Sequence, residues 1–304
     1  TMQKRMDGEE GTRNLKTGIE ELDDATGGIN LQDLIVVAGR PGMGKTEFAL
    51  KIVDGVTAAG GGALIFSMEM AAAQIVERSL AGSGNMSVSR LRNPLDMQDE
   101  DWARFTAAME TMNGRDIWIV DATDLTIEQI RAVAETHKRR YPHLAMIVVD
   151  YLGLIKKPKA ERNDLAIAHI SRNLKTMAMR LHTPTFALSQ LSRAVDSRPA
   201  TQRRPVMSDL RDSGSIEQDA DSIMFLYRDE VYNPESPAAG VAEIILGKSR
   251  FSAAGAIIYQ EFKNGHFLSM DQHVGKEKTR IQLEAAKPRK QPRKYSERFN
   301  TDAF

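Results

Sequence analysis

The chain has 304 residues, of which 41% are hydrophobic and 27% charged, as is ordinary for a soluble globular protein of one large or two small domains. Its formal net charge is zero, which argues against a protein that coats nucleic acid by bulk attraction but not against a few local contacts with DNA. It contains no cysteine, which excludes disulfides and thiolate zinc sites. Because the sequence has neither an apolar run of bilayer length nor a signal-peptide core, we expect a cytoplasmic protein without a membrane partner.

The two ends of the chain differ in composition from the rest. Residues 1–14 are polar and contain glycine, so we expect the remnant of a linker, and a first residue other than Met is typical of a fragment or a processed chain. Residues 275–304 combine low hydrophobicity with clustered Lys, Arg and Pro, which predicts a basic, disordered tail. Residues 15–274 are then expected to form one domain.

Within residues 15–274, short apolar runs alternate with segments of helical spacing. In chain order we expect a strand at 34–39, a helix at 45–58, a strand at 63–67, a helix from 71 and another at 98–112. A strand at 116–120, a helix at 126–140, a strand at 145–149, a helix at 163–181 and strands at 185–188, 222–227 and 242–246 follow, and 255–262 would pair with 242–246. This alternation predicts an α/β fold with a doubly wound, mostly parallel sheet and an antiparallel edge hairpin.

The segment GRPGMGKT matches the P-loop pattern in full, after an expected strand and before an expected helix. Glycines let the backbone wrap a phosphate, and the helix N-terminus adds partial positive charge. Lys45 would reach the β and γ phosphates of ATP and act in catalysis, and the Thr46 hydroxyl would bind Mg²⁺. A glycine-rich turn that binds nothing is the alternative. The candidate nucleotide-binding residues are Gly39, Arg40, Pro41, Gly42, Met43, Gly44, Lys45, Thr46 and Glu47.

Three polar side chains follow predicted strands, at the sheet edge where open α/β proteins bind ligands. Asp150 ends MIVVD, where a carboxylate could hold Mg²⁺ directly or through water, or could be an ordinary strand-ending residue. Glu69 follows ALIFS, a strand that we expect beside the P-loop strand, and could orient the water that attacks the γ-phosphate or only cap a helix. Gln190 follows TFALS and could sense the γ-phosphate or be a surface residue.

The ordered series GRPGMGKT, ALIFSMEM, MIVVDYLGLI, FALSQLSR and SDLRDSGSIEQDADSIMFLYRDE resembles the RecA-like motor domain of DnaB-type replicative DNA helicases. The resemblance extends from about Thr17 to about Phe262. Its most specific part is Ser208–Glu230, since the P-loop and the Asp150 strand are common to RecA-like ATPases. It implies an ATP-dependent motor that translocates on single-stranded DNA, 5′ to 3′, and unwinds duplex DNA at the replication fork.

The resemblance also implies roles for single residues. Glu69 would be the catalytic glutamate, Asp150 the Mg²⁺-linked acid and Gln190 the γ-phosphate sensor. The stretch GKSR matches a hairpin that supplies a Lys and an Arg to the nucleotide of the neighbouring subunit, which indicates Lys248 and Arg250. A site shared in this way implies a ring, most simply a homo-hexamer. Without the resemblance, these two residues would be read as the solvated end of a hairpin.

The central-channel loop of the family corresponds to LRDSGSIEQ, so Arg211, Asp212 and Gly214 would face the DNA backbone. Arg211 can donate to phosphate, and Gly214 allows close approach of a backbone N–H. Asp212 stands where the family has Glu, and a carboxylate cannot donate to phosphate. A polar turn ahead of a short helix is the alternative for this loop. The basic segment Lys156–Arg162 would line the same channel or form a solvated loop.

Besides Asp212, the sequence departs from the family at two further points. Gly42 stands where the family has Ser, a mild change because glycine fits this turn. The N-terminal primase-binding domain is absent from the sequence, which leaves contacts with a primase or a helicase loader open. Two other functions compete: a RecA-like recombinase, against which SDLRDSGSIEQDAD argues, and a non-motor ATP-binding loader or adaptor.

Overall fold

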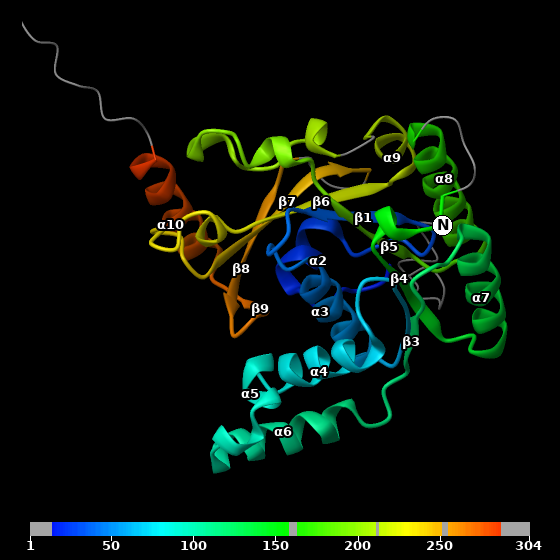
Figure 1. Ribbon diagram of the computed structural model, residues 1–304, viewed down its shortest axis with the longest axis horizontal. Helices are drawn as coiled ribbons and strands as arrows, with labels where there is room; N and C mark the ends of the chain where they lie inside the picture. Colours follow the sequence, from blue (N-terminus) through cyan, green and yellow to red (C-terminus); the bar gives the residue numbers. More distant parts are fainter. Residues whose placement is uncertain (1–13, 158–162, 211–212, 251–254, 287–304) are drawn as a thin grey trace, which may run out of the picture.

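A computed structural model of the chain describes residues 14–157, 163–210, 213–250 and 255–286. Within these ranges a nine-stranded mixed sheet forms the centre of the molecule, with helices on both faces (Figure 1). The strands are β1 (Leu34–Gly39), β2 (Gly62–Ser67), β3 (Ile117–Asp121), β4 (Leu144–Asp150), β5 (Thr185–Gln190), β6 (Ser222–Tyr227), β7 (Val241–Ser249), β8 (Ile257–Lys263) and β9 (His266–Ser269).

The order of the strands across the sheet is β3-β2-β4-β5-β1-β6-β7-β8-β9. The first six strands of this order are parallel to their neighbours, and β7, β8 and β9 are antiparallel. The predicted fold, a doubly wound and mostly parallel sheet with an antiparallel edge hairpin, is therefore confirmed. The expectation that the strand before Glu69 lies beside the P-loop strand is wrong, because β4 and β5 lie between β2 and β1.

Helices cover the sheet in two groups. They are α2 (Glu20–Thr26), α3 (Lys45–Ala58), α4 (Ala72–Ser83), α5 (Val88–Arg92), α6 (Asp99–Met112), α7 (Ile127–Arg140), α8 (Asn163–Leu181), α9 (Ser213–Asp219) and α10 (Gln272–Ala285). Side chains of α2, α3 and α4 pack on one face of the sheet, and those of α7, α8 and α9 pack on the other. Over the described ranges, none of the helices combines the length and the apolarity needed to cross a bilayer.

The strand before the P-loop lies at the centre of both cores. All six residues of β1 are buried, with Ile35 and Val37 in the core on the α3 side and Val36 and Ala38 in the core on the α8 side. A strand that is covered on both faces needs an uninterrupted apolar run, and LIVVAG supplies one. The end of β1 is thereby held rigidly at the carboxyl edge of the sheet.

The C-terminal segment departs from the expectation of disorder after residue 275. Residues Gln272–Ala285 form α10, which packs on β8 and β7, so the expected tail begins too early. Asp271 caps this helix, since its Oδ1 accepts a hydrogen bond from Val274 N at 2.9 Å. Gln282 is 3% exposed, and its amide donates to Asp229 Oδ1 at 3.0 Å. Buried hydrogen bonds thus hold a helix whose composition lacks an apolar stripe; residues 287–304 lie outside the described ranges.

Candidate functional site

The P-loop closes between the end of β1 at Gly39 and the start of α3 directly after Gly44. Two of its residues, Gly42 and Gly44, have φ angles of +82° and +89°, a conformation that favours glycine. A Cβ atom on Gly44 would also lie 3.1 Å from the rings of Phe262 and Phe267. The loop is therefore held between α3 and the β8–β9 hairpin, and it needs glycine for its backbone angles and for space.

A cavity of about 420 Å³ opens beside the P-loop, at the carboxyl ends of four parallel strands. It brings together Lys45, Thr46, Glu69, Asp150 and Gln190, which come from α3 and from the segments that end β2, β4 and β5. Five side chains, predicted from four separate sequence motifs, thus line one cavity. Ligands bind at this edge in open α/β sheets.

Thr46 and Asp150 meet at the floor of this cavity. The Thr46 hydroxyl donates to Asp150 Oδ2 at 2.8 Å, although the two residues are 104 positions apart. Burial raises the pKa of Asp150, and the Glu69 carboxylate raises it further. The hydrogen bond from Thr46 and the positive charges of Lys45 and Arg78 oppose this rise. Hard oxygen ligands in an electron-rich, buried setting suit a magnesium ion, so the pair fits the predicted metal role.

Lys45 extends along the end of β1. Its Nζ donates to the carbonyl oxygens of Gly39 at 3.1 Å and Arg40 at 3.4 Å. Burial lowers the pKa of Lys45, whereas the carboxylates of Asp150 and Glu69 raise it. A polyphosphate in the cavity would offset the cost of burying this ammonium group.

Two other P-loop side chains are directed into the protein. The guanidinium of Arg40 donates to Asp196 at 2.6 and 3.0 Å and to the Leu191 carbonyl at 2.9 Å, which ties the P-loop to the segment after β5. Met43 is 1% exposed, and its sulfur accepts a hydrogen bond from Arg228 N at 3.3 Å. These side chains shape the loop, so any contact with a nucleotide at these two positions falls to the backbone.

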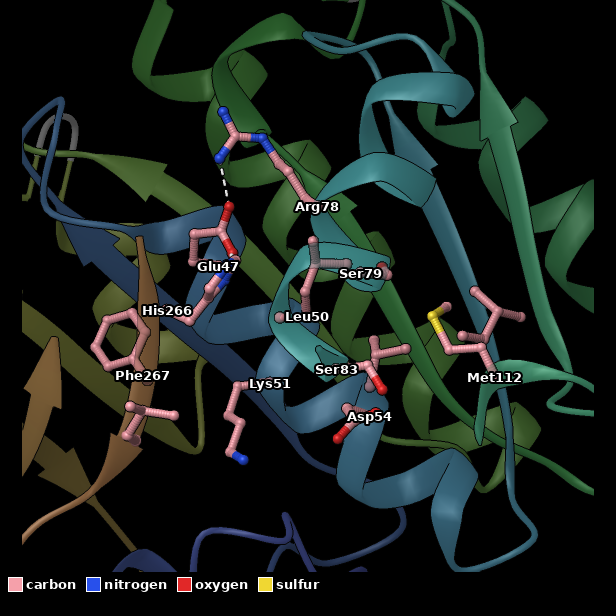
Figure 2. Close-up of a pocket in the computed structure, with 14 residues that line it drawn as sticks. Glu47, Leu50, Lys51, Asp54, Arg78, Ser79, Ser83, Met112, His266 and Phe267 are labelled. Carbon is pink, nitrogen blue, oxygen red and sulfur yellow. Dashed lines mark hydrogen bonds and ion pairs between the residues drawn. The ribbon is translucent and has the colours of Figure 1, made fainter. Parts of the chain in front are cut away.

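Glu47 lies on the first turn of α3, but its carboxylate is engaged by protein groups. It forms an ion pair with Arg78, and Oε2 lies 3.1 Å from His266 Nδ1 (Figure 2). The structure therefore places this predicted nucleotide-binding residue at the cavity wall with its charge already paired.

Glu69 and Gln190 are held at the cavity by the sheet itself. Met68 N donates to the Asp150 carbonyl at 2.9 Å, which fixes the turn after β2 against β4 and leaves Glu69 exposed on the cavity wall. Gln190 is half-buried and stands opposite Gly39 in the β5–β1 register. Both residues thus line the cavity beside the P-loop, and their roles stay predictions.

Lys248 and Arg250 lie far from the P-loop of their own chain. Lys248 Nζ donates to the carbonyls of Glu217 and Ala220, at 2.6 Å each, and Arg250 pairs with Asp221 at 3.2 Å. Because β7 is antiparallel to β6, its end lies beside the beginning of β6, at the amino edge of the parallel strands. The strand β1, six residues long, separates this edge from the P-loop by roughly 17 Å. The structure does not bring these two residues into the cavity of the same chain.

The predicted DNA-contacting residues are only partly described. Arg211 and Asp212 lie outside the described residues. Gly214 lies in the first turn of α9 and is exposed, and a Cβ at this position would meet no atom within 4 Å. The alternative interpretation placed a short helix after a polar turn, and the helix α9 is present but begins at Ser213, so most of the segment LRDSGSIEQ is helical.

The basic segment after β4 is partly engaged with the protein. Lys156 Nζ pairs with Asp124 at 2.8 Å, and residues 158–162 lie outside the described ranges. Lys157 lines a second cavity of about 620 Å³, which shares Gln190 with the nucleotide cavity. Lys157 and Gln190, the predicted γ-phosphate sensor, thus line one cavity.

The sequence predicted a role for neither of two arginines, one that lines the cavity and one that contacts the P-loop. Arg78 on α4 lines the nucleotide cavity, and Arg228 supports the P-loop by donating to the Gly42 carbonyl at 3.0 Å. Arg228 also lies over the ring of Phe262, 3.4 Å from its centroid, and pairs with Glu230. A lone arginine in a helix carries no sequence signal of its own. Arg228 stands in the family-like stretch YRDE, which is the one hint available.

The comparisons with known proteins agree with this geometry. The profile of the DnaB-like helicase C-terminal domain matches residues 14–266. Replicative DNA helicase DnaB of Pasteurella multocida (strain Pm70) is 43% identical over 256 residues, which cover 83% of this chain and 54% of that protein. The chain thus spans about half the length of the curated relatives it matches.

Two solved structures are also similar. One, described as an ATPase domain, has a TM-score of 0.82 at 32% identity, over 89% of this chain and 96% of that chain. Another, described as a DnaB-like replicative helicase and its interactions with primase, has a TM-score of 0.81 at 32% identity, over 89% and 65% of the two chains. The chain belongs to the DnaB-like helicase C-terminal domain family.

Proposed function

We propose that the chain is the motor of a replicative DNA helicase, which hydrolyses ATP, translocates on single-stranded DNA and unwinds the duplex, 5′ to 3′. The observation that carries the proposal is the single cavity in which Lys45, Thr46, Glu69, Asp150 and Gln190 meet, in a chain of the DnaB-like family. Relatives named replicative DNA helicase support the same function.

ATP would bind with its β and γ phosphates in the P-loop. The N–H groups at the start of α3 and the Lys45 ammonium would cradle the phosphates, and Lys45 would also offset charge that builds during phosphoryl transfer. Thr46 and Asp150 would hold Mg²⁺, which when bound neutralises charge on the phosphate oxygens. The 2.8 Å hydrogen bond between these two side chains supports that assignment.

Glu69 would orient the attacking water, since its carboxylate is exposed on the cavity wall opposite the P-loop. Gln190 would hydrogen-bond to the γ-phosphate and report its loss. Gln190 borders both the nucleotide cavity and the cavity lined by Lys157, which supports a link between nucleotide state and the basic segment.

Lys248 and Arg250 would complete the site of a neighbouring subunit. Both residues lie at the opposite edge of the sheet from Lys45, so the nucleotide that they contact would be one bound to a neighbouring chain. A head-to-tail contact of this kind closes into a ring when the rotation permits, and we propose a homo-hexamer.

DNA would pass through the channel of that ring. The residues facing the DNA backbone would be Arg211, Asp212 and Gly214. The binding of DNA should therefore be independent of base sequence and sensitive to salt. A relative's structure is described with its interactions with primase, which supports primase as a further partner of the whole protein. A helicase loader is proposed as a partner from the family resemblance alone.

Two alternatives remain distinguishable by experiment. A recombinase would form an open filament, which electron microscopy separates from a closed ring. A non-motor loader or adaptor would bind ATP without displacing a strand. Glu69→Gln should abolish strand displacement under the helicase proposal, and a variant that unwinds normally would rule out the proposed role of Glu69.

The decisive measurement is ATP hydrolysis against protein concentration, with and without single-stranded DNA, for the wild type and Arg250→Ala. A steep concentration dependence, stimulation by DNA and loss of activity in the variant are expected for a ring motor with shared sites. Activity that is proportional to protein and indifferent to DNA and to Arg250 would mean a self-contained ATPase.

A further inference from the structure

A small cavity of about 50 Å³ lies behind the P-loop, between α3, α4 and β9 (Figure 2). One of its walls is a group of three charged or titratable side chains, Glu47, Arg78 and His266, which no part of the proposed mechanism uses. Glu47 directly follows the Mg²⁺-binding position Thr46 on α3, and its side chain is 8% exposed. A buried carboxylate needs partners, and this one has two.

His266 holds one oxygen of Glu47. Its Nδ1 lies 3.1 Å from Glu47 Oε2, and its Nε2 lies 2.7 Å from the Met86 carbonyl. The ring is 5% exposed and fits against α4 at Gly82, where a Cβ would come within 3.3 Å of Nδ1. A carbonyl oxygen and a carboxylate oxygen both only accept, so these two contacts require a proton on Nε2 and a second proton on Nδ1. The ring then acts as an imidazolium that is fixed in one orientation, with Nδ1–H donating toward the carboxylate.

Arg78 takes the other oxygen of Glu47. Its side chain is 36% exposed and lines the nucleotide cavity together with Glu69 and Asp150. Figure 2 shows one terminal nitrogen of Arg78 directed at Glu47 and the other directed away from it.

We propose that Glu47 and His266 are positioning residues, which hold Arg78 with a free N–H edge toward the transferring phosphoryl group. Arg78 is then a second arginine at the nucleotide, supplied by the same chain, while Arg250 comes from the neighbour. This inference rests on the proposed ATPase function and deepens it. The ligand of Arg78 is the γ-phosphoryl oxygens of a nucleoside triphosphate.

The physical reason lies in the exposure of Arg78. A half-exposed arginine samples many rotamers, and holding it in a productive geometry costs side-chain entropy at each turnover. A buried carboxylate that is itself fixed by a buried imidazole removes that freedom before the nucleotide binds. The gain appears in the transition state, where charge builds on the phosphoryl oxygens.

The test compares steady-state ATP hydrolysis of full-length variants, with kcat and KM separated. Arg78→Ala should lower kcat about a hundredfold and Glu47→Gln about tenfold, with KM for ATP changed by less than about twofold. His266→Asn, which can keep a donor near Nδ1, should retain more activity than His266→Leu. Lys51→Gln is the matched control, because Lys51 lines the same small cavity one turn further along α3.

A double variant separates positioning from plain stability. If Glu47 acts through Arg78, then Glu47→Gln should lower kcat no further once Arg78→Ala is present. Losses in kcat that multiply in the double variant, or a Glu47→Gln protein with wild-type kcat, would overturn the inference. Lys45→Ala serves as the reference for the proposed function: if it hydrolyses ATP as well as the wild type, the P-loop assignment itself fails, independently of Arg78.

Discussion

Because Lys45 and Arg250 lie at opposite edges of one sheet, we expect two inactive variants, Lys45→Ala and Arg250→Ala, to recover ATP hydrolysis when they are mixed. Lys45→Ala removes the phosphate-binding lysine of a subunit's own site, and Arg250→Ala removes the arginine given to the neighbour. Each homogeneous ring should lose activity about a thousandfold or more, the effect of an absent arginine finger. In a ring mixed at equal amounts, about a quarter of the interfaces pair an intact Lys45 with an intact Arg250.

The assay is the rate of phosphate release after the two variants are dissociated, mixed and reassembled at a concentration that supports rings. Recovery to about a quarter of the wild-type rate per subunit is expected if each interface acts alone. Lys45→Ala mixed with the Lys45→Ala, Arg250→Ala double variant is the control, since it contains no complete interface. If the first mixture stays as inactive as the control while rings form, then the site is not shared between subunits and the assignment of Arg250 is wrong.

Three further predictions concern single positions. Asp221→Ala should lower the free energy of unfolding, measured in urea, by about 3 kcal/mol, because its 2% exposed carboxylate pairs with a mostly buried lysine. Asp124→Ala should lower it by less than about 1 kcal/mol, because the Asp124 side chain is 69% exposed and its partner Lys156 is 55% exposed, so equal losses would contradict the argument. Gly44→Ala should weaken nucleotide binding, measured by equilibrium titration, at least tenfold, which is roughly the effect of 1.4 kcal/mol of strain. The φ angle of Gly44 is +89°, and the rings of Phe262 and Phe267 leave no space for a Cβ atom, so unchanged binding would show that the loop adapts. Asp150→Asn should abolish ATP hydrolysis yet stabilise the nucleotide-free protein at neutral pH. Burial raises the pKa of Asp150 in the folded state, so the stability that this carboxyl group contributes is present below its unfolded-state pKa and is lost as the pH rises through its folded-state pKa. A stabilisation of the variant that persists at pH values below both of these pKa values would refute this argument.

The central part of the fold could be predicted from local sequence because its constraints are local. The run LIVVAG must be covered on both faces, and the glycines after it permit only a tight turn, so β1, the P-loop and α3 follow from residues 34–58 alone. The strands that end at Asp150 and Gln190 were predicted for the same reason. Their convergence on one cavity followed from the rule that parallel strands present their carboxyl ends at one edge.

Other features depend on contacts between distant positions and leave no local signal. The order of the strands puts β4 and β5 between β2 and β1, and Glu69 reaches the cavity because the turn after β2 is bonded to β4 rather than to the P-loop strand. The helix α10 has the composition of a tail and is held by Gln282, whose partner Asp229 is 53 residues away. The partners that engage the Glu47 carboxylate are 31 and 219 residues away, so its position beside the P-loop could not reveal them.

The contacts that hold Arg250 indicate how the proposed nucleotide sites of neighbouring subunits could be coupled. The Asp221 carboxylate that pairs with Arg250 also accepts hydrogen bonds from Lys175 Nζ at 2.6 Å and from Leu34 N at 2.8 Å, and Leu34 is the first residue of β1. One end of β1 is therefore linked, through Asp221, to the arginine that we propose for the site of the next subunit, and the other end leads into the P-loop of the same chain. Because this strand is packed on both faces, we expect its two ends to move together. A change at the nucleotide should consequently tilt the whole domain, and Arg250 should enter or leave the neighbouring site by rotation of subunits rather than by reordering of a loop.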